Sequence, residues 1–550
     1  RVLNDYRLNR YAQQVSLNGF FDWGVEFSKL HKLKFTSMVL RQTDGDTVYR
    51  TGFDEGLSVN TRDTRLGWIE RQVVSQQAQG NHTFHRLADF QVDWRYAFSH
   101  AVRDEPDRRS YTYTETERGD YVMATAGGNE RLFAKGTDAS HEGQLDLTQP
   151  FGLWRGLKGK AKAGGLAFSR TRDASVRRFS YDVSLPAFPE LRTQNPETIF
   201  DLAGPAPAAF REITNSSDSY EASMLLFGGY AMAELPLHKR FDLVAGARLE
   251  KANIKVDTFD QFNAGDPIRA SLDNLDVLPA LNLTYRMPRD FQLRGGYSRT
   301  LNRPDFRELS ESQYFDIEYN AAFSGNSKLK RARIDNLDAR LEWYYTTDEV
   351  FSIGAFTKLF DQPIESVQRP SAATLFSFEN AKSAYSYGLE LEGRKRFDFI
   401  SKRLDPLFFA ANLTLIRSRV KIASAEGGDG TALTSENRPL AAQSPYVLNL
   451  QTGWDDSGEG GTGMAASLLY NVYGRRLRSV ATAGTGQDNL YERPFHSLDF
   501  VLSQTLRRGF KLGLRVRNIL NSKVVWEQGD IVVRSFQRGA DGQVNVSWSY

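Results

Sequence analysis

The chain of 550 residues contains no cysteine, so it forms no disulfide and offers no thiolate to a metal or a substrate. It also carries little excess charge, because 70 lysines and arginines face 67 aspartates and glutamates. A net charge of +3 over this length gives no field that would collect nucleic acid. We therefore expect neither a cysteine-based active site nor a nucleic-acid partner.

Long hydrophobic runs are missing as well. The longest weakly polar stretch covers residues 222–233 and is interrupted by a glycine pair. A membrane-spanning helix needs about 20 consecutive apolar residues, so the sequence excludes a helical membrane protein. It does not exclude a protein that crosses the membrane with strands, because that signal is weak and spread over many short segments.

Aromatic residues are plentiful, at 12% of the chain, and many of them recur at every second position. In residues 90–99, apolar or aromatic side chains from Phe90 to Phe98 alternate with mostly polar ones. Since a strand places successive side chains on opposite faces, this pattern predicts a strand with one apolar face. The same alternation recurs in residues 33–39, 243–249, 337–345, 446–454, 498–502 and 512–516. Sustained helical periodicity is absent, and the predicted fold class is all-β.

The connections between these segments alternate in length. Short turns are predicted near residues 28–32, 81–87, 150–157, 235–240, 286–290, 346–349, 398–406, 455–462 and 507–510. Long polar loops are predicted near residues 43–61, 103–140, 171–219, 256–275, 301–332, 363–383, 421–443, 475–495 and 523–540. Such asymmetry is typical of a transmembrane antiparallel β-barrel with short periplasmic turns and long extracellular loops. The main alternative, a β-propeller, would show a blade-length repeat, and we find none.

Counting the segments gives about 19 strands, of which the first and the last both run toward the short turns. Bacterial single-chain barrels have even strand numbers, so an odd number does not close one. We therefore expect residues 1–550 to form one barrel domain that begins after its earliest strands.

The C-terminal segment has a pattern of its own. Val544, Val546, Trp548 and Tyr550 alternate with polar residues, and an aromatic side chain closes the chain. This resembles the terminal signal that the barrel assembly machinery recognises in bacterial outer-membrane proteins. An ordinary final strand that ends in tyrosine is the alternative.

Residues 245–250 place a glycine and an arginine before a glutamate, and residues 276–285 with 293–307 form the longest block of recognisable motifs. These segments resemble the C-terminal barrel of TonB-dependent outer-membrane receptors. Further matches lie at residues 325–336, 380–392, 438–449 and 518–521. No single motif is specific, but their order along residues 220–550 carries the resemblance.

The resemblance implies a bacterial outer-membrane location and a barrel of about 22 strands, with an N-terminal plug domain and a TonB-contact segment preceding it. The plug and about three strands are therefore expected upstream of this chain. It also implies a receptor that imports a scarce nutrient, such as a metal–siderophore chelate, with energy delivered through TonB. The expected partners are outer-membrane lipid and lipopolysaccharide, the plug and through it TonB, the barrel assembly machinery and an unknown extracellular ligand. No cofactor is expected.

Two clusters of residues in the predicted outer loops are candidates for ligand binding. Arginine and tyrosine side chains suit anionic metal chelates by charge and stacking, although aromatic residues suit carbohydrate equally well. The first cluster comprises Arg108, Arg109, Tyr111, Tyr113, Arg118 and Tyr121. The second comprises Arg299, Asn302, Arg303 and Asp305, with Arg307 beside them. Solvated loops without a ligand are the alternative reading.

Charged residues on the polar faces of the predicted strands are expected to point into the lumen. A water-filled or plugged interior requires such charges, and they need no specific ligand. The family resemblance adds a second role, contact with the plug. The set comprises Asp93, Arg95, Arg248, Glu250, Arg340, Glu342, Glu390 and Glu392.

The sequence supports no catalytic or metal site. His82 and His85 could offer two metal ligands, but they fall in a predicted turn without an evident third ligand. The chain has neither a nucleophile elbow nor a phosphate-binding loop of the Walker type. We expect a receptor that is not an enzyme; a structural or adhesive barrel that displays its loops, or a passive porin, is the alternative.

Overall fold

The computed structural model describes residues 4–55, 57–125, 128–181, 192–193, 210–260, 265–316, 321–369, 375–422, 438–456, 462–481, 487–506 and 509–548. One antiparallel sheet of 21 strands dominates the fold. Two of its members, β5 (Tyr121–Met123) and β8 (Phe210–Glu212), are three-residue additions, and 21 less these two leaves 19 long strands. The predicted all-β barrel class and the count of about 19 strands are confirmed.

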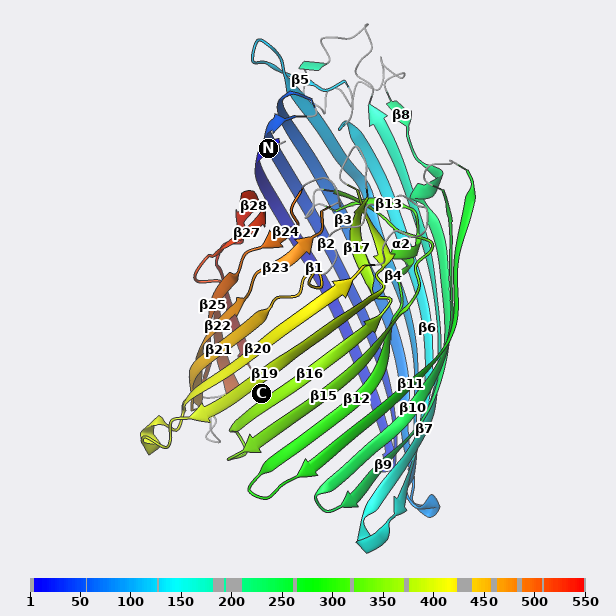
Figure 1. Cartoon of the computed structure of the whole chain (residues 1–550), viewed down its shortest axis with the longest axis vertical. Coiled ribbons are helices and arrows are strands. Elements are labelled where there is room, and N and C mark those ends of the chain that lie inside the picture. The colour runs from blue at the N-terminus through cyan, green and yellow to red at the C-terminus, as the bar shows by residue number, and fades with distance from the viewer. Residues whose placement is uncertain are drawn as a thin grey trace.

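The long strands follow one another in chain order, and each pairs antiparallel with the next. The sheet curves into a tilted tube (Figure 1). The long strands are β1 (Asn4–Ser28), β2 (His31–Asp54), β3 (Val59–Phe84), β4 (Phe90–Glu115), β6 (Glu130–Gly152), β7 (Lys158–Tyr181), β9 (Tyr220–His238), β10 (Phe241–Phe259), β11 (Pro267–Arg286), β12 (Phe291–Asn302), β15 (Ala332–Tyr344), β16 (Val350–Asp361), β19 (Ser383–Arg396), β20 (Leu407–Lys421), β21 (Tyr446–Asp455), β22 (Gly463–Tyr473), β25 (Phe495–Thr505), β26 (Phe510–Arg517) and β29 (Asp541–Trp548).

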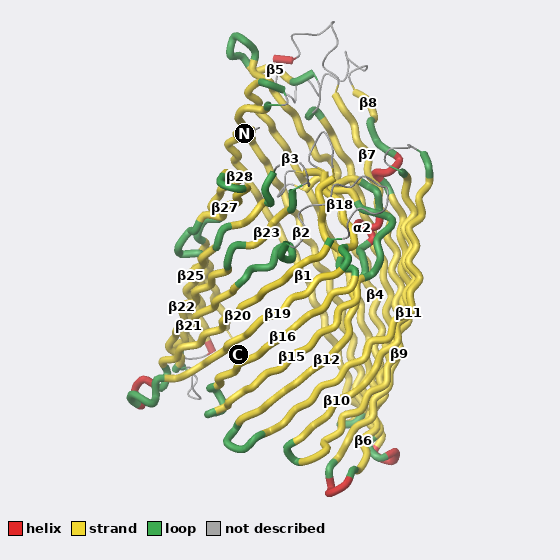
Figure 2. The backbone as a smooth tube through the Cα atoms, in the orientation of Figure 1, coloured by secondary structure: helices red, strands yellow, loops and turns green. Residues whose placement is uncertain are grey.

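Short turns join the strands at one end of the tube, as predicted. They include the connections at residues 29–30, 239–240 and 287–290, and turns of this kind lie together at the lower end of Figure 2. Connections at this end carry the short helices η1 (His85–Leu87), η2 (Trp154–Gly156) and η6 (Lys402–Leu404). This end is the expected periplasmic side.

Strands at the other end extend further than the sequence predicted. Residues 43–61 and 103–140 were expected to be loops, but β2, β3, β4 and β6 run through most of them and have 23 to 26 residues each. A membrane needs only about 9–11 residues per strand. Beyond the membrane both faces of a strand can contact water, so the apolar alternation ends while the backbone ladder continues. The loop predictions were wrong for this physical reason.

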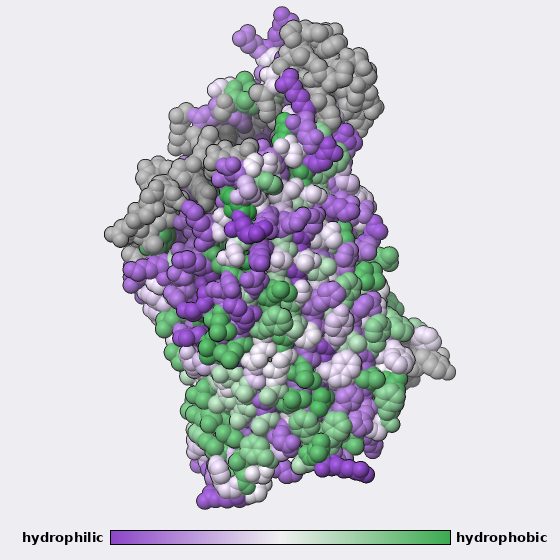
Figure 3. Space-filling view, turned by 90° about the vertical axis from the view of Figure 1, so that its right-hand side faces the viewer, coloured by the Kyte–Doolittle hydropathy of each residue, from purple (hydrophilic) through white to green (hydrophobic). Residues whose placement is uncertain are grey.

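Exposed apolar side chains form a belt around the lower part of the tube. On β9 to β11 they occupy alternate positions, with Phe227 57% exposed, Leu249 52% exposed and Leu275 64% exposed. Figure 3 shows this apolar surface below a hydrophilic upper part. A surface of this kind is stable only against lipid, so the belt marks the membrane-spanning zone.

Part of the chain folds into the upper end of the tube (Figure 1). A four-stranded sheet there contains β13 (Gln313–Asp316), β14 (Ala321–Ser324), β18 (Leu375–Asn380) and β17 (Ile364–Arg369), and a short helix, α2 (Phe306–Leu309), lies beside it. Phe306 and Leu309 pack with Ile254 and Val256 of β10 in the largest buried cluster. These four side chains are at most 3% exposed, so the α2 segment is anchored to the inner wall.

A second four-stranded sheet rises above the last barrel strands. It contains β23 (Arg476–Ser479), β24 (Leu490–Glu492), β27 (Lys523–Gln528) and β28 (Ile531–Gln537). Val524 and Trp526 pack against Phe495 at its base. A further short helix, η5 (Ser216–Asp218), precedes β9. No helix in the described ranges is long and apolar enough to cross a membrane.

The described part of the main sheet has two edges. β1 pairs only with β2, and β29 pairs only with β26. Because neighbouring strands are antiparallel throughout, the first and the nineteenth strands run in the same direction. Two such strands cannot join directly as an antiparallel pair.

Candidate ligand-binding mouth and lumen

A large open cavity of about 1760 Å³ lies in the upper part of the tube. The upper halves of β1 to β4 line one side, and the β28 strand lines another. Its lining contains seven arginines, namely Arg10, Arg50, Arg65, Arg108, Arg178, Arg534 and Arg538. Five carboxylates accompany them, namely Asp5, Asp63, Glu130, Asp218 and Asp488. The lining is therefore net basic.

Ion pairs hold several of these arginines in place. Arg50 donates to Asp63 at 2.7 Å, and Thr112 donates to the other oxygen of the same carboxylate at 2.7 Å. Arg178 donates to the buried Asp218 at 3.1 Å. Such contacts fix the guanidinium groups in one orientation, which is how a preorganised anion site is built.

The structure divides the first predicted cluster. Arg108, Arg109, Tyr111 and Tyr113 lie on β4 and not in a loop, so their predicted placement was wrong. Arg108 lines the cavity, whereas Arg109, its neighbour on the opposite face of the strand, pairs with Asp107 at 2.8 Å. Arg108 is drawn toward Glu105, 3.6 Å away, whose side chain is only 4% exposed.

The aromatic members of this cluster serve packing as well as lining. Tyr111 is buried with Met123 and touches Tyr113. Tyr121 begins β5, where the Arg62 guanidinium lies 3.6 Å from the centre of its ring. Arg118 lies in the turn between β4 and β5. Ligand binding by these six residues stays a prediction.

The second predicted cluster is divided as well. Arg299 lies on the outer face of β12 and donates to Asp335 of β15 at 2.8 Å, beside the Tyr297 hydroxyl. Asn302 is the last residue of β12. Arg303 lies just beyond it, points inward and donates to Glu250 of β10 at 2.8 Å. Sequence alternation predicts opposite faces for Arg299 and Asn302, but residues beyond the strand end escape that rule.

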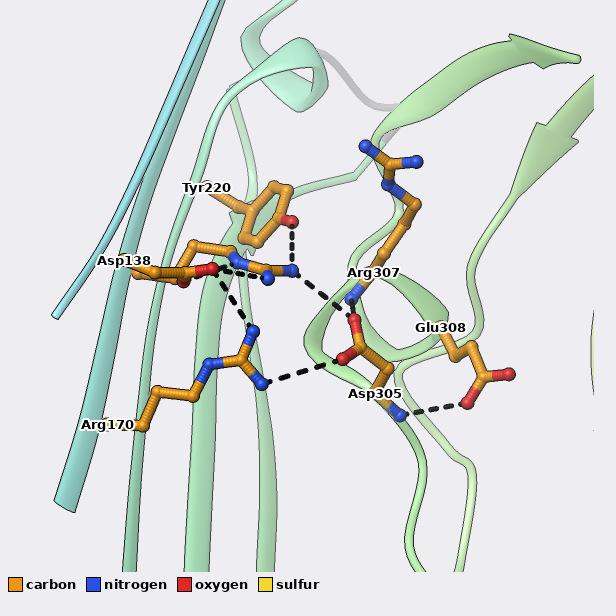
Figure 4. A network of polar contacts seen from close by, with 7 residues as sticks. Asp138, Arg170, Tyr220, Asp305, Arg307 and Glu308 are labelled. Atoms are coloured by element: carbon orange, nitrogen blue, oxygen red, sulfur yellow. Dashed lines mark hydrogen bonds and ion pairs between the residues drawn. The ribbon is translucent and has the colours of Figure 1, made fainter. Parts of the chain in front are cut away.

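Asp305 anchors the α2 segment to the barrel wall (Figure 4). Its carboxylate accepts from Arg172 at 3.3 Å and lies 3.8 Å from Arg170, both on β7. Asp138 of β6 joins the two arginines, accepting from Arg172 at 2.7 Å. The carboxylate of Asp305 also caps α2 by accepting the backbone N–H of Arg307.

Glu308 completes this end of α2. Its carboxylate accepts the backbone N–H of Asp305 at 2.9 Å, which makes a capping box. Burial raises the pKa of Glu308, and the neighbouring carboxylate of Asp305 adds to the rise. The segment is therefore held by charged contacts on its first turn and by apolar contacts on Phe306 and Leu309.

Asp276 is a buried hub that the sequence did not single out. Its side chain is 2% exposed, accepts from Arg331 at 2.7 Å and lies 3.9 Å from Arg303. Arg303 bridges it to Glu250, which also accepts from Arg248 at 2.6 Å. The residues Asp138, Arg170 and Arg172 were missed as well. Asp138 and Arg172 fall in stretches expected to be loops, and Arg170 directly precedes one of them. Only their contact with Asp305, far away in sequence, reveals them.

The predicted lumenal charges mostly pair across strands. Asn81 donates to Asp93 at 2.7 Å, and Arg95 donates to Glu142 at 2.7 Å. Arg340 bridges Glu392 at 2.6 Å and Glu342 at 2.9 Å. Glu390 lies on the same face of β19, opposite Gly354. Charges that neutralise one another in this way keep the wall hydrated without a strong net field.

The C-terminal strand β29 presents its alternating residues outward. Val544 and Val546 are 66% and 65% exposed, and Trp548 stacks on Phe510 at 6.0 Å between ring centres. Tyr550, the last residue of the predicted assembly signal, lies outside the described residues. Recognition by the assembly machinery stays a prediction.

Histidines do not form a metal cluster in the described ranges, where no group of three or more potential ligands is found. His82 lies at the end of β3 rather than in a turn, 3.3 Å from the ring nitrogen of His31. Trp94 donates to the other ring nitrogen of His82 at 3.2 Å. His85 lies apart from this pair, on η1, beside Asp89.

The apolar belt, the short turns and the charged interior define an outer-membrane β-barrel receptor. The chain belongs to the family described as TonB dependent receptor-like, beta-barrel, which it matches over residues 4–519. This confirms the resemblance found in the sequence and places the protein in the bacterial outer membrane. The family is one of receptors and transporters rather than enzymes.

Solved structures of low sequence identity share the fold. The ferric yersiniabactin uptake receptor FyuA from Yersinia pestis is 12% identical, with a TM-score of 0.56, and the match covers 98% of this chain and 78% of that one. The ferric-catecholate import receptor Fiu from E. coli K12 is 11% identical with a TM-score of 0.57, covering 98% and 82%. The copper transporter OprC is 15% identical with a TM-score of 0.54, covering 100% and 80%. No curated protein matches the sequence.

Proposed function

We propose that this barrel imports a scarce nutrient, such as an anionic metal–siderophore chelate, with energy coupled through TonB. The observation that carries the proposal is the arginine-lined cavity at the outer end of a barrel of this family. Guanidinium groups recognise carboxylates and other oxyanions by paired hydrogen bonds. The siderophore and copper transport named for FyuA, Fiu and OprC supports a metal-containing cargo.

The energy-coupling element belongs to the same proposal. We infer that a plug domain and about three further strands complete the barrel, as the family pattern of about 22 strands requires. The parallel direction of the two sheet edges supports this, since an odd number of added strands lets every junction be antiparallel. The plug would then meet the paired charges of the lumenal wall and TonB on the periplasmic side.

Uptake of a labelled ferric siderophore by cells that produce the full protein tests the proposal. Deletion of TonB is expected to abolish uptake, and continued uptake would show a passive pore. The adjacent arginines Arg108 and Arg109 provide a matched pair, because only Arg108 lines the cavity. R108Q is expected to weaken ligand binding about tenfold, the effect of one lost charge-assisted contact, whereas R109Q leaves it unchanged. Equal effects of the two substitutions would exclude the cavity as the binding site.

A further inference from the structure

We propose that the outer surface of β20 binds the phosphate groups of a phosphorylated lipid headgroup in the outer leaflet. Three exposed basic side chains, Arg417, Arg419 and Lys421, occupy every second position at the upper end of this strand. Alternate residues share one face and lie about 6.7 Å apart, so the three form a straight basic row. The proposal is independent of what the barrel transports.

The row faces outward. Arg417 and Arg419 pair in register with Tyr387 and Tyr385 of β19, and one step below them Leu415 pairs with Leu389. Leu415 and Leu389 are 44% and 49% exposed and belong to the apolar belt. Side chains paired in this way share a face of the sheet, so the basic row continues the lipid-facing surface upward.

The row also lies at headgroup height. Arg417 stands ten residues beyond Leu407, the first residue of β20 at the short-turn end. Ten residues rise about 33 Å along a strand, which is about 23 Å along the axis of a barrel with strands tilted by about 45°. The apolar band of such barrels is about 25 Å tall. Arg417 is thus at the outer boundary of the hydrocarbon, where lipid phosphates are found.

Several other outward cations of the barrel are already neutralised. Lys251, also ten residues beyond the start of its strand, pairs with Asp273. Arg269 pairs with Asp257, and Arg299 pairs with Asp335. In contrast, Arg417, Arg419 and Lys421 form no ion pair with any residue in the described part of the chain. Within the residues that the structure describes, the surface of β20 therefore offers this row no carboxylate partner.

The chemistry of the row favours a lipid phosphate. Each basic residue near an anionic membrane surface adds about 1 kcal/mol, or about fivefold in affinity, and guanidinium groups bind phosphate oxygens in pairs. Tyr385 and Tyr387 stack at 6.2 Å beside the row. Tyrosine is the side chain that sits well at a membrane boundary, with its ring in the apolar zone and its hydroxyl in water. Charge complementarity and continuity with the belt together identify the occupant.

Native mass spectrometry of the full protein in detergent tests this proposal, with bisphosphorylated lipid A as the probe and dephosphorylated lipid A as its control. We expect the wild type to retain the phosphorylated probe at least tenfold more tightly than the dephosphorylated one. The triple variant R417Q/R419Q/K421Q should lose roughly 10- to 100-fold in affinity for the phosphorylated probe. The matched variant K251Q/R269Q/R299Q, which removes three paired cations, should change it less than about threefold.

Further variants keep the test decisive. R417K/R419K preserves the charge and should keep most of the binding, while R417Q alone should lose several-fold even if the triple variant fails to assemble. Unchanged binding in R417Q and the triple variant would overturn the proposal. So would an equal loss in the K251Q/R269Q/R299Q control. Displacement of the lipid by millimolar inorganic phosphate would show a free-anion site instead and would overturn it too.

Discussion

Arg303 donates to Glu250 at 2.8 Å although 53 residues separate them in the chain. The arginine stands where the chain leaves β12 and turns inward, and the glutamate stands on the inner face of β10. Asp276 on β11, 3.9 Å from the same guanidinium, extends the contact to Arg331. These pairs fasten both ends of the segment that carries α2 to the inner wall.

Replacement of Asp276 by alanine should destabilise the barrel strongly. The carboxylate is 2% exposed, and its loss removes the charge that compensates the largely buried Arg331, whereas Arg303 keeps its pair with Glu250. Breaking a buried ion pair costs about 3–5 kcal/mol, and thermal unfolding in detergent measures it. Asp273 lies on the same strand as Asp276, but its exposed carboxylate pairs with Lys251 of β10, so D273A should cost less than about 1 kcal/mol. Equal losses in the two variants would refute the hub role of Asp276.

Replacement of Asp305 by alanine should loosen the α2 segment without unfolding the barrel. The change removes the helix cap and the contacts to Arg170 and Arg172. Loss of a cap costs about 1 kcal/mol, so backbone amides of residues 306–309 should exchange hydrogen about five- to tenfold faster. Hydrogen-exchange mass spectrometry measures this rate. D348A, in an exposed periplasmic turn, is the control, and protection that persists in D305A would show that apolar packing alone holds α2.

The sequence predicted the barrel well because lipid imposes a regular pattern on it. Phe227, Leu249 and Leu275 alternate with inward side chains, and turns such as residues 239–240 interrupt the pattern at regular places. The pattern ends where lipid ends. The upper halves of β3 and β4 were predicted to be loops because water on both faces removes the alternation of apolar and polar residues. The backbone pairing of the two strands nevertheless continues as far as Thr61 and Thr114.

The candidate site could be predicted only in part, because it lies above the membrane, where the alternation of apolar and polar residues is lost. Arg108 and Arg303 were singled out by residue type, and both lie in the upper interior. Arg109 and Arg299 were singled out by the same criterion, but their strands turn them outward. Where both faces of a strand are polar, the residue type does not show whether a side chain points into the barrel or out of it. Contacts such as that between Arg172 and Asp305, 133 residues apart, depend on how a long loop folds back, and no local signal specifies it.

Gly325 should tolerate no side chain. A Cβ atom there would lie 2.1 Å from the carbonyl oxygen of Ser310 and 2.6 Å from that of Arg307, both backbone atoms that cannot move aside alone. G325A should therefore displace the α2 segment and lower stability by about 1–3 kcal/mol, as overpacking does. G136A on β6, where a Cβ would meet nothing within 4 Å, should be near neutral. Thermal unfolding distinguishes the two, and a neutral G325A would show that the loop shifts freely.

The buried pair of Glu365 and Arg438 should make stability depend on pH. Arg438 donates to the carboxylate at 2.8 Å, with side chains 2% and 9% exposed. Burial raises the pKa of Glu365, and the attraction of Arg438 offsets this only partly. The folded state therefore holds the proton more tightly than the unfolded state. The corresponding stability is fully present below the unfolded pKa of about 4.3 and is lost as the pH rises through the folded pKa.

E365Q tests this dependence, because glutamine resembles the protonated acid and does not titrate. The unfolding free energy of E365Q minus that of the wild type should rise from acid to neutral pH, by about 1.4 kcal/mol for each unit by which the folded pKa exceeds the unfolded one. Denaturant midpoints between about pH 4 and pH 7 measure it. The same substitution at the exposed Glu221 is the control. A difference that falls toward neutral pH would mean that the attraction of Arg438 outweighs the cost of burying the Glu365 carboxylate.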